Sequence, residues 1–138
     1  MFAFSNFAGR LVWGFLSDFL GARACLALAL SVQGVGIALL AWPGMAGGAY
    51  LLLAAVVGFG FGGNFVLFAK ETSQAFGVER LANIYPYVFI GYALAGIFGP
   101  LTGGLLYDFT GNYFAGIMVA ALISFAGAAL FVRRKTVD

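Results

Sequence analysis

Residues 46–69 read AGGAYLLLAAVVGFGFGGNFVLFA and contain no charged side chain. A helix needs about 20 mostly apolar residues to cross the ~30 Å of hydrocarbon in a bilayer. A strand of a membrane barrel would instead show ~10 residues of alternating polarity. This stretch is longer than such a strand and is apolar on all sides, so it predicts a transmembrane helix.

Four other apolar stretches predict further helices, at residues 1–16, 24–41, 82–107 and 113–132. The first is shorter than a full span, and we interpret it as the last part of a longer helix. It has no basic start and it contains Arg10, which distinguishes it from a signal peptide. We therefore expect one all-α, polytopic helical membrane domain over residues 1–138, with about five transmembrane helices. Short polar segments should join these helices, at residues 17–23, 70–80 and 108–112 and in a turn at 42–48.

The composition excludes a soluble domain. Of the 138 residues, 63% are hydrophobic and 9% are charged, whereas a soluble domain has about 25% charged residues. The chain has no histidine, no basic tract and a single cysteine, Cys25, which argues against a nucleic-acid partner, an internal disulfide and a metal site. No span contains a pair of acids or a nucleophile beside a base, so we expect neither an enzyme nor a bound cofactor.

The basic residues outside the first stretch all fall on one side of the expected topology. The turns at 42–48 and 108–112, on the other side, contain no Lys or Arg. Cytoplasmic loops are enriched in basic residues, so we expect the basic side and the C-terminus to be cytoplasmic, in a plasma (inner) membrane. The residues concerned are Arg23, Lys70, Arg80, Arg133, Arg134 and Lys135.

Arg10 is the one basic residue inside an apolar stretch. It precedes Asp18, which marks the end of the helix, by eight residues, and this spacing puts it ~12 Å deep in the membrane. An arginine at such a depth costs at least ~2.5–3.5 kcal/mol, and it normally faces a cavity or a partner. Its planar fork matches a carboxylate, which favours an anion-binding site. The alternatives are an arginine that extends to the interface or one that pairs structurally with a carboxylate.

A polar segment follows the first stretch, where residues 14–23 read GFLSDFLGAR. Gly14 and Gly21 permit a tight turn between two helices. Asp18 is placed to cap free N–H groups at the start of the next helix, and Arg23 adds a charge on the cytoplasmic side. The alternative is an ordinary capped turn without a further function.

Glycines crowd two of the expected spans and predict close helix packing. In the third span these include Gly58 and Gly62, and the neighbouring Asn64 would either hydrogen-bond to another helix or face a cavity. In the fourth span, Tyr85 and Tyr92 are seven residues apart and share a helix face. The glycines and proline expected to pack there are Gly99, Pro100, Gly103 and Gly104.

Several of these motifs occur together and in one order: NFAGR at residues 6–10, the segment 14–23, Gly77, the stretch 85–104, and DFTGNY at 108–113. In this arrangement the chain resembles the C-terminal half of a major facilitator superfamily transporter. Within that superfamily it resembles the oxalate/formate antiporters and the monocarboxylate transporters. The resemblance implies a partial major facilitator fold, in which the five stretches are the end of helix eight and helices nine to twelve.

The same resemblance implies roles for individual residues. Arg10 stands where the group has an arginine that binds the substrate carboxylate. Asn6 stands where monocarboxylate transporters have a proton-coupling aspartate, and Tyr92 where oxalate carriers have a second cation, a lysine. A single cation fits a monoanion better than a dianion. Asp18 and Arg23 would hold the cytoplasmic gate.

The function expected from these observations is secondary active transport of a small organic anion, a monocarboxylate, by alternating access, as a symporter or an antiporter. Such carriers bind their substrate near the membrane midplane between two halves. The chain would then need a missing N-terminal half or a second copy as its partner, besides the lipid bilayer. The alternative is a truncated, non-transporting half or a membrane scaffold.

Overall fold

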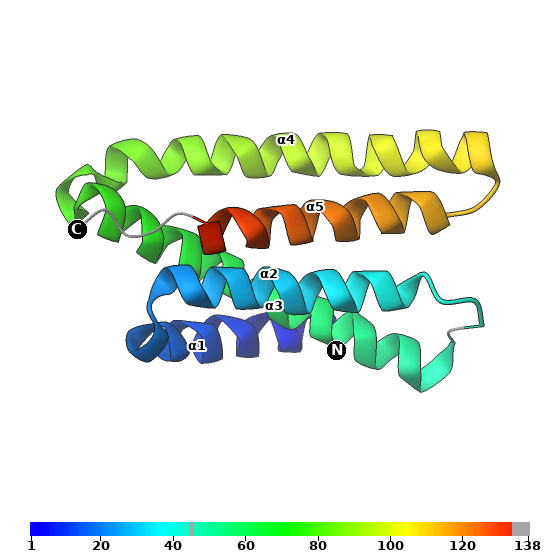
Figure 1. Cartoon of the computed structure of the whole chain (residues 1–138), viewed down its shortest axis with the longest axis horizontal. Helices are drawn as coiled ribbons and strands as arrows, with labels where there is room; N and C mark the ends of the chain where they lie inside the picture. Colours follow the sequence, from blue (N-terminus) through cyan, green and yellow to red (C-terminus); the bar gives the residue numbers. More distant parts are fainter. Residues whose placement is uncertain (45, 134–138) are drawn as a thin grey trace.

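The computed structural model describes residues 1–44 and 46–133, and within this part of the chain every regular element is an α-helix. The helices run in antiparallel succession (Figure 1). The all-α fold expected from the sequence is therefore confirmed. The five helices are α1 (Phe2–Leu20), α2 (Ala22–Leu40), α3 (Gly47–Phe76), α4 (Val78–Thr110) and α5 (Phe114–Arg133).

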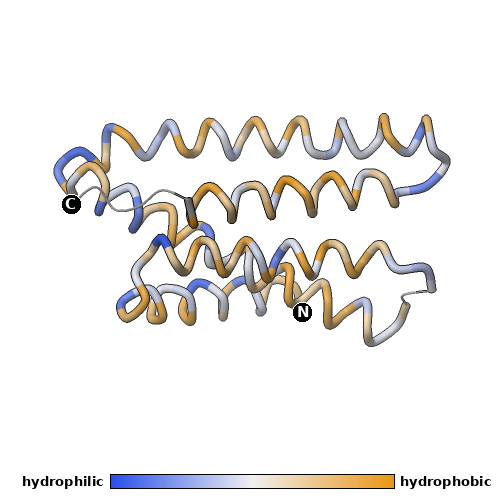
Figure 2. Tube along the Cα trace, viewed as in Figure 1, coloured by the Kyte–Doolittle hydropathy of each residue, from blue (hydrophilic) through white to orange (hydrophobic). Residues whose placement is uncertain are grey.

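Four of these helices, α2 to α5, are long and apolar enough to cross a membrane. The remaining helix, α1, carries Arg10 and Asp18 within its 19 residues and is not among the four. Figure 2 shows apolar residues along the helices and hydrophilic residues gathered mainly at the joints. The chain is accordingly a multi-pass helical membrane protein.

Two of the joints are much shorter than the sequence predicted. Gly21 alone separates α1 from α2, and Gly77 alone separates α3 from α4. Their φ angles are 83° and 85°, with ψ near 150°, a combination that essentially only glycine adopts. Because one glycine reverses the chain, the polar residues expected in joints 17–23 and 70–80 are mostly helical. Gly14 also lies inside α1, so it makes no turn.

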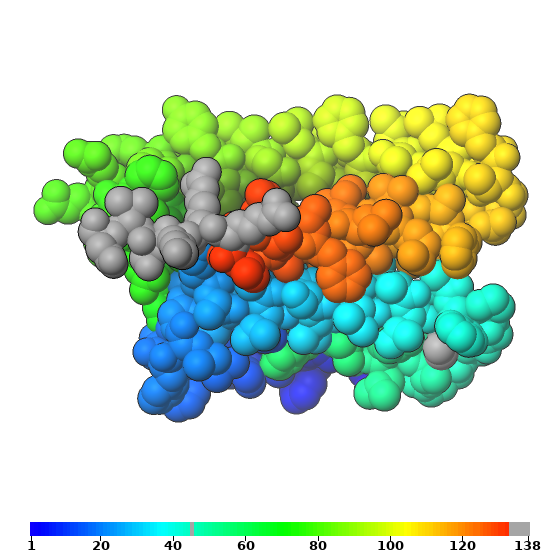
Figure 3. All heavy atoms as spheres, in the orientation of Figure 1, coloured from blue at the N-terminus to red at the C-terminus, as the bar shows by residue number. Residues whose placement is uncertain are grey.

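The helices pack around α2 and α3. Helix α3 packs most extensively against α1 and α2, while α5 packs against α2. Figure 3 shows α5 seated between α4 and α2 on one face of the molecule. Helix α4 lies at the edge and has no buried residue, and among the described helices it contacts only α3 and α5. The tightly buried cluster comprises Trp13, Cys25, Leu26, Ala29 and Leu67.

Glycines allow α1 and α3 to cross in backbone contact. A Cβ atom added at Gly62 would lie 2.0 Å from the carbonyl oxygen of Asn6, and one at Gly9 would lie 2.1 Å from that of Phe59. A Cβ at Gly58 would lie 2.8 Å from the ring of Phe2. Larger residues would therefore force these two helices apart.

The glycines of the fourth span behave differently. A Cβ atom added at Gly99, Gly103 or Gly104 would meet no atom within 4 Å among the described residues. Helix α4 also continues without interruption through Pro86 and Pro100. The α5 backbone approaches one of them, since a Cβ atom added at Gly116 would lie 3.5 Å from the Cα atom of Gly103.

The basic residues gather at one end of the bundle. Arg23 and Arg80 lie in the first turns of α2 and α4, and Lys70 lies near the end of α3, so all three are at the end with the two glycine joints. The opposite end carries the α2–α3 and α4–α5 connections, whose described residues include no Lys or Arg. Arg134 and Lys135 lie outside the described residues.

Candidate functional site

Arg10 and Asn6 lie one turn apart on the same face of α1. The Nε atom of Arg10 donates a hydrogen bond to Oδ1 of Asn6 over 3.2 Å. This is the one hydrogen bond found for the Arg10 side chain among the described residues, and the guanidinium is exposed on the surface of the bundle. Its two terminal Nη groups therefore remain available to a ligand.

The guanidinium of Arg10 lies over the ring of Phe65. The Cζ atom of Arg10 lies 4.9 Å from the centroid of the Phe65 ring, which extends from α3. A cation over an aromatic face at this distance gains ~0.5–1 kcal/mol at an exposed site. An aromatic side chain of α3 thus makes a cation–π contact with the guanidinium carried by α1.

Tyr92 reaches the same place from α4. Its ring packs edge-on against Phe65 at 5.2 Å between centroids, and at 6.0 Å from Phe61. Tyr92 is therefore connected to Arg10 through Phe65. Of the residues selected from the sequence, Asn6 is bonded to Arg10 and Tyr92 packs on Phe65, a residue that sequence analysis missed.

Phe65 gave no signal of its own in the sequence. It is one of 16 phenylalanines and lies in an apolar run. The available hint was its position next to Asn64 and the glycines of α3, which mark where α3 approaches other helices.

Two open hollows on the surface do not contain Arg10. One, of about 560 Å³, runs along α4 and is lined by Val78, Leu81, Ala82, Tyr85, Pro86 and Phe89. The other, of about 350 Å³, is lined by residues of α1, α2 and α3, from Phe4 to Phe59. Neither is lined by a charged side chain, so neither offers a counter-charge to an anion. The exposed face around Arg10 is the better candidate because it carries the cation.

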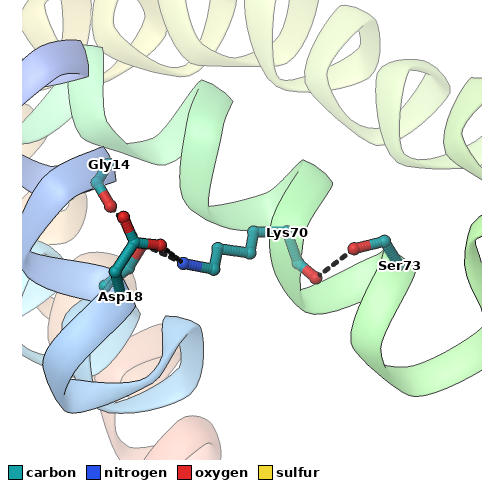
Figure 4. A network of polar contacts seen from close by, with 5 residues as sticks. Gly14, Asp18, Lys70 and Ser73 are labelled. Carbon is teal, nitrogen blue, oxygen red and sulfur yellow. Dashed lines mark hydrogen bonds and ion pairs between the residues drawn. The ribbon is translucent and has the colours of Figure 1, made fainter.

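A second polar cluster ties α1 to α3 at the end with the glycine joints (Figure 4). Lys70 extends from α3 and forms an ion pair with Asp18, and its Nζ atom donates a hydrogen bond to Oγ of Ser17 over 2.9 Å. The hydroxyl of Ser17 in turn donates to the carbonyl of Gly14 over 2.6 Å. These contacts hold the end of α1 against α3.

The structure corrects one expectation about residues 14–23. Asp18 lies inside α1 and does not cap the next helix, since α2 begins without any side-chain cap. Arg23 turns toward α5, where its Nε atom donates to the carbonyl of Phe131 over 2.9 Å. Phe131 belongs to α5, so this hydrogen bond joins the start of α2 to α5. Asp18 and Arg23 thus have different partners.

Asn64 forms a polar contact between α2 and α3. Its Nδ2 atom donates to Oε1 of Gln33 over 3.1 Å, which decides between the two alternatives left open by the sequence in favour of a hydrogen bond across helices. Among the residues described, no group of three or more His, Cys, Asp or Glu side chains could hold a metal ion.

The fold and the position of Arg10 define a polytopic helical membrane protein with a cation held on one face of its helices. The sequence profile of the Major Facilitator Superfamily matches residues 1–138. The chain therefore belongs to this superfamily of membrane transporters.

Individual relatives match at low identity. The chain is 30% identical over 123 residues to the oxalate:formate antiporter of Oxalobacter formigenes, which covers 88% of the chain and 29% of the relative. It is 33% identical over 107 residues to monocarboxylate transporter 9 of Gallus gallus, covering 76% and 21% respectively. It is 30% identical over 93 residues to the uncharacterized transporter YhjX of Escherichia coli, covering 67% and 23%. The chain thus spans less than a third of each of these relatives, and no solved structure matches it significantly.

Proposed function

We propose that the protein carries a small organic anion, a monocarboxylate, across a membrane by secondary active transport. The observation that supports this most is the arrangement of Arg10, whose Nε is bonded to Asn6 and whose guanidinium lies over the ring of Phe65. The charge lies ~12 Å along α1 from Asp18. A guanidinium that is always charged and is held in one orientation at this depth can bind a carboxylate through two parallel hydrogen bonds.

The number of cations favours a monoanion. Tyr92, which stands where oxalate carriers have a lysine, contributes a hydroxyl and a ring to this face but no charge. Two of the relatives are named for the carboxylates that they carry, the oxalate:formate antiporter and monocarboxylate transporter 9. Their names support an organic anion, and the single charge of Arg10 selects the monocarboxylate among them.

Transport by alternating access requires two halves that move against each other around the substrate. The face that carries Arg10 would be one wall, and the opposite wall would come from the N-terminal half of a transporter or from a second copy. The contacts of Asp18 and Arg23 would keep this half rigid near a cytoplasmic gate. The charge bias of the joints supports a cytoplasmic position for the basic end and the C-terminus, in a plasma (inner) membrane.

Uptake of radiolabelled monocarboxylates into proteoliposomes containing the full-length protein tests the proposal. Arg10→Gln should abolish uptake, because a charge-assisted hydrogen bond worth ~1.5–3 kcal/mol is lost. Arg10→Lys, which keeps the charge without the fork, should weaken uptake strongly. Arg80→Gln removes an exposed cation elsewhere and serves as the control. Unchanged uptake in Arg10→Gln would reduce Arg10 to a structural residue, and absence of uptake in the unmodified protein would favour a non-transporting half or scaffold.

A further inference from the structure

Phe65 is the point where three helices meet at the anion site. Its ring lies under the guanidinium of Arg10 from α1, at 4.9 Å. The same ring contacts Tyr92 from α4 at 5.2 Å and Phe61 from its own helix at 5.4 Å, both edge-on. These contacts leave the ring little freedom to rotate, so the surface below the guanidinium is a fixed one.

The backbone of Phe65 is also held from α4. The hydroxyl of Tyr85 donates a hydrogen bond to the carbonyl oxygen of Phe65 over 3.0 Å. A carbonyl oxygen has two lone pairs, so it can accept this bond in addition to its helical one. The ring of Tyr85 packs edge-on against Phe89 at 5.0 Å, and Phe89 in turn lies 6.5 Å from Phe65. Both the side chain and the main chain of Phe65 are thus fixed by α4.

The geometry around Arg10 leaves one edge of the guanidinium open. The Nε atom is bonded to Asn6, and the Cζ atom lies over the ring of Phe65. The remaining in-plane edge presents both Nη groups, the pair that binds a carboxylate with two parallel hydrogen bonds. Orientation of the fork before binding lowers the entropy that the ligand must otherwise overcome.

We propose that Phe65 is a positioning residue of the anion site, which orients the fork of Arg10 toward the substrate without contacting the substrate itself. This inference rests on the proposed function. Without the aromatic face, the guanidinium would adopt its binding orientation for only part of the time, and the apparent affinity would fall by that fraction. An aromatic face worth ~0.5–1 kcal/mol at an exposed site corresponds to about a two- to fivefold change.

The experiment measures KM and the maximal rate of monocarboxylate uptake in proteoliposomes containing the full-length protein. Phe65→Leu keeps an apolar side chain but removes the aromatic face, and it should raise KM about two- to fivefold with little change in the maximal rate. Phe65→Tyr keeps the face and should stay close to the unmodified protein. Phe68→Leu is the matched control: Phe68 is another phenylalanine of α3 that packs against Phe131, it is not among the rings that pack on Phe65, and its KM should stay unchanged.

A trifluorophenylalanine at position 65 separates positioning from packing. It has nearly the shape of phenylalanine, but its ring face attracts a cation much less, because the attraction comes from the ring quadrupole. It should raise KM as Phe65→Leu does, even if the leucine variant folds poorly. A KM equal to that of the unmodified protein in this variant would overturn the inference.

The proposed function and this inference fail in different ways. If Arg10→Gln abolishes uptake while the trifluorinated variant keeps the normal KM, only the positioning role of Phe65 is wrong. If Arg10→Gln leaves uptake unchanged, the anion site itself is wrong and the role of Phe65 is overturned with it.

Discussion

Replacement of Gly62 by alanine should separate α1 from α3 at the anion site. The added Cβ would lie 2.0 Å from the carbonyl oxygen of Asn6, and 2.8 Å from its carbonyl carbon. These are backbone atoms, so no side-chain rotation relieves the contact. Ordinary van der Waals contact begins near 3.4 Å, and the helices must therefore move apart by up to about 1.4 Å, the difference between the two distances.

Such a shift acts directly on the arrangement around Arg10. The guanidinium now lies 4.9 Å from the ring of Phe65, and a displacement of this size along that direction would carry it beyond the ~6 Å within which a cation and a ring attract. Overpacking of a well-packed contact also costs ~1–3 kcal/mol. We expect Gly62→Ala to lower the midpoint of thermal unfolding in detergent by about 3–10 °C and to raise the KM for a monocarboxylate.

Gly91→Ala is the control for this experiment. A Cβ atom at Gly91, in α4, would meet no atom within 4 Å among the described residues, and alanine favours a helix by up to ~1 kcal/mol over glycine. This variant should therefore keep or slightly raise the midpoint and leave uptake unchanged. Equal unfolding midpoints for Gly62→Ala and Gly91→Ala would refute the close crossing of α1 and α3.

Three other predictions concern charges. Lys70→Asp should lower the unfolding midpoint, and the combination with Asp18→Lys should restore most of it. The loss in the free energy of unfolding should stay near ~1 kcal/mol, because Asp18 is 65% exposed and exposed ion pairs contribute little. A double variant no more stable than Lys70→Asp would contradict the pairing. Tyr92→Lys should shift uptake from monocarboxylates toward dicarboxylates, measured by competition across a panel of both, and an unchanged preference would place Tyr92 outside the site. Cysteines introduced at Arg80 and Asn112, without the native cysteine, should react with an impermeant reagent from opposite membrane sides, and labelling of both from one side would disprove the topology.

The sequence predicted the helices well because a span in lipid must form its backbone hydrogen bonds within itself. A long uncharged run such as residues 46–69 therefore predicts a helix. The ends of the helices were harder to predict, because polar residues near the membrane surface tolerate both helix and loop. Lys70 and Glu71 are helical since Gly77 alone supplies the reversal.

The candidate site could be predicted only in part. Arg10 was found because a charge inside an apolar run is costly, and Asn6 was selected from the resemblance to the monocarboxylate transporters. Phe65 could not be selected, because the sequence does not distinguish a phenylalanine that contacts a cation from one that faces lipid. The contact between Arg10 and Phe65 depends on how closely α1 approaches α3, which the glycines allow but do not position.

The polar contacts between the described helices are unevenly distributed. Ion-pair and hydrogen-bond contacts tie α1 to α3 through Lys70, and α2 to α5 through Arg23 and Ser124. Helix α4 has no buried residue, and the one side-chain hydrogen bond recorded between it and another described helix runs from Tyr85 to the carbonyl of Phe65. A movement of α4 would therefore act first on the residue that faces Arg10. Since coupling between two sites is reciprocal, an anion that fixes Arg10 against Phe65 would also stabilise one position of α4.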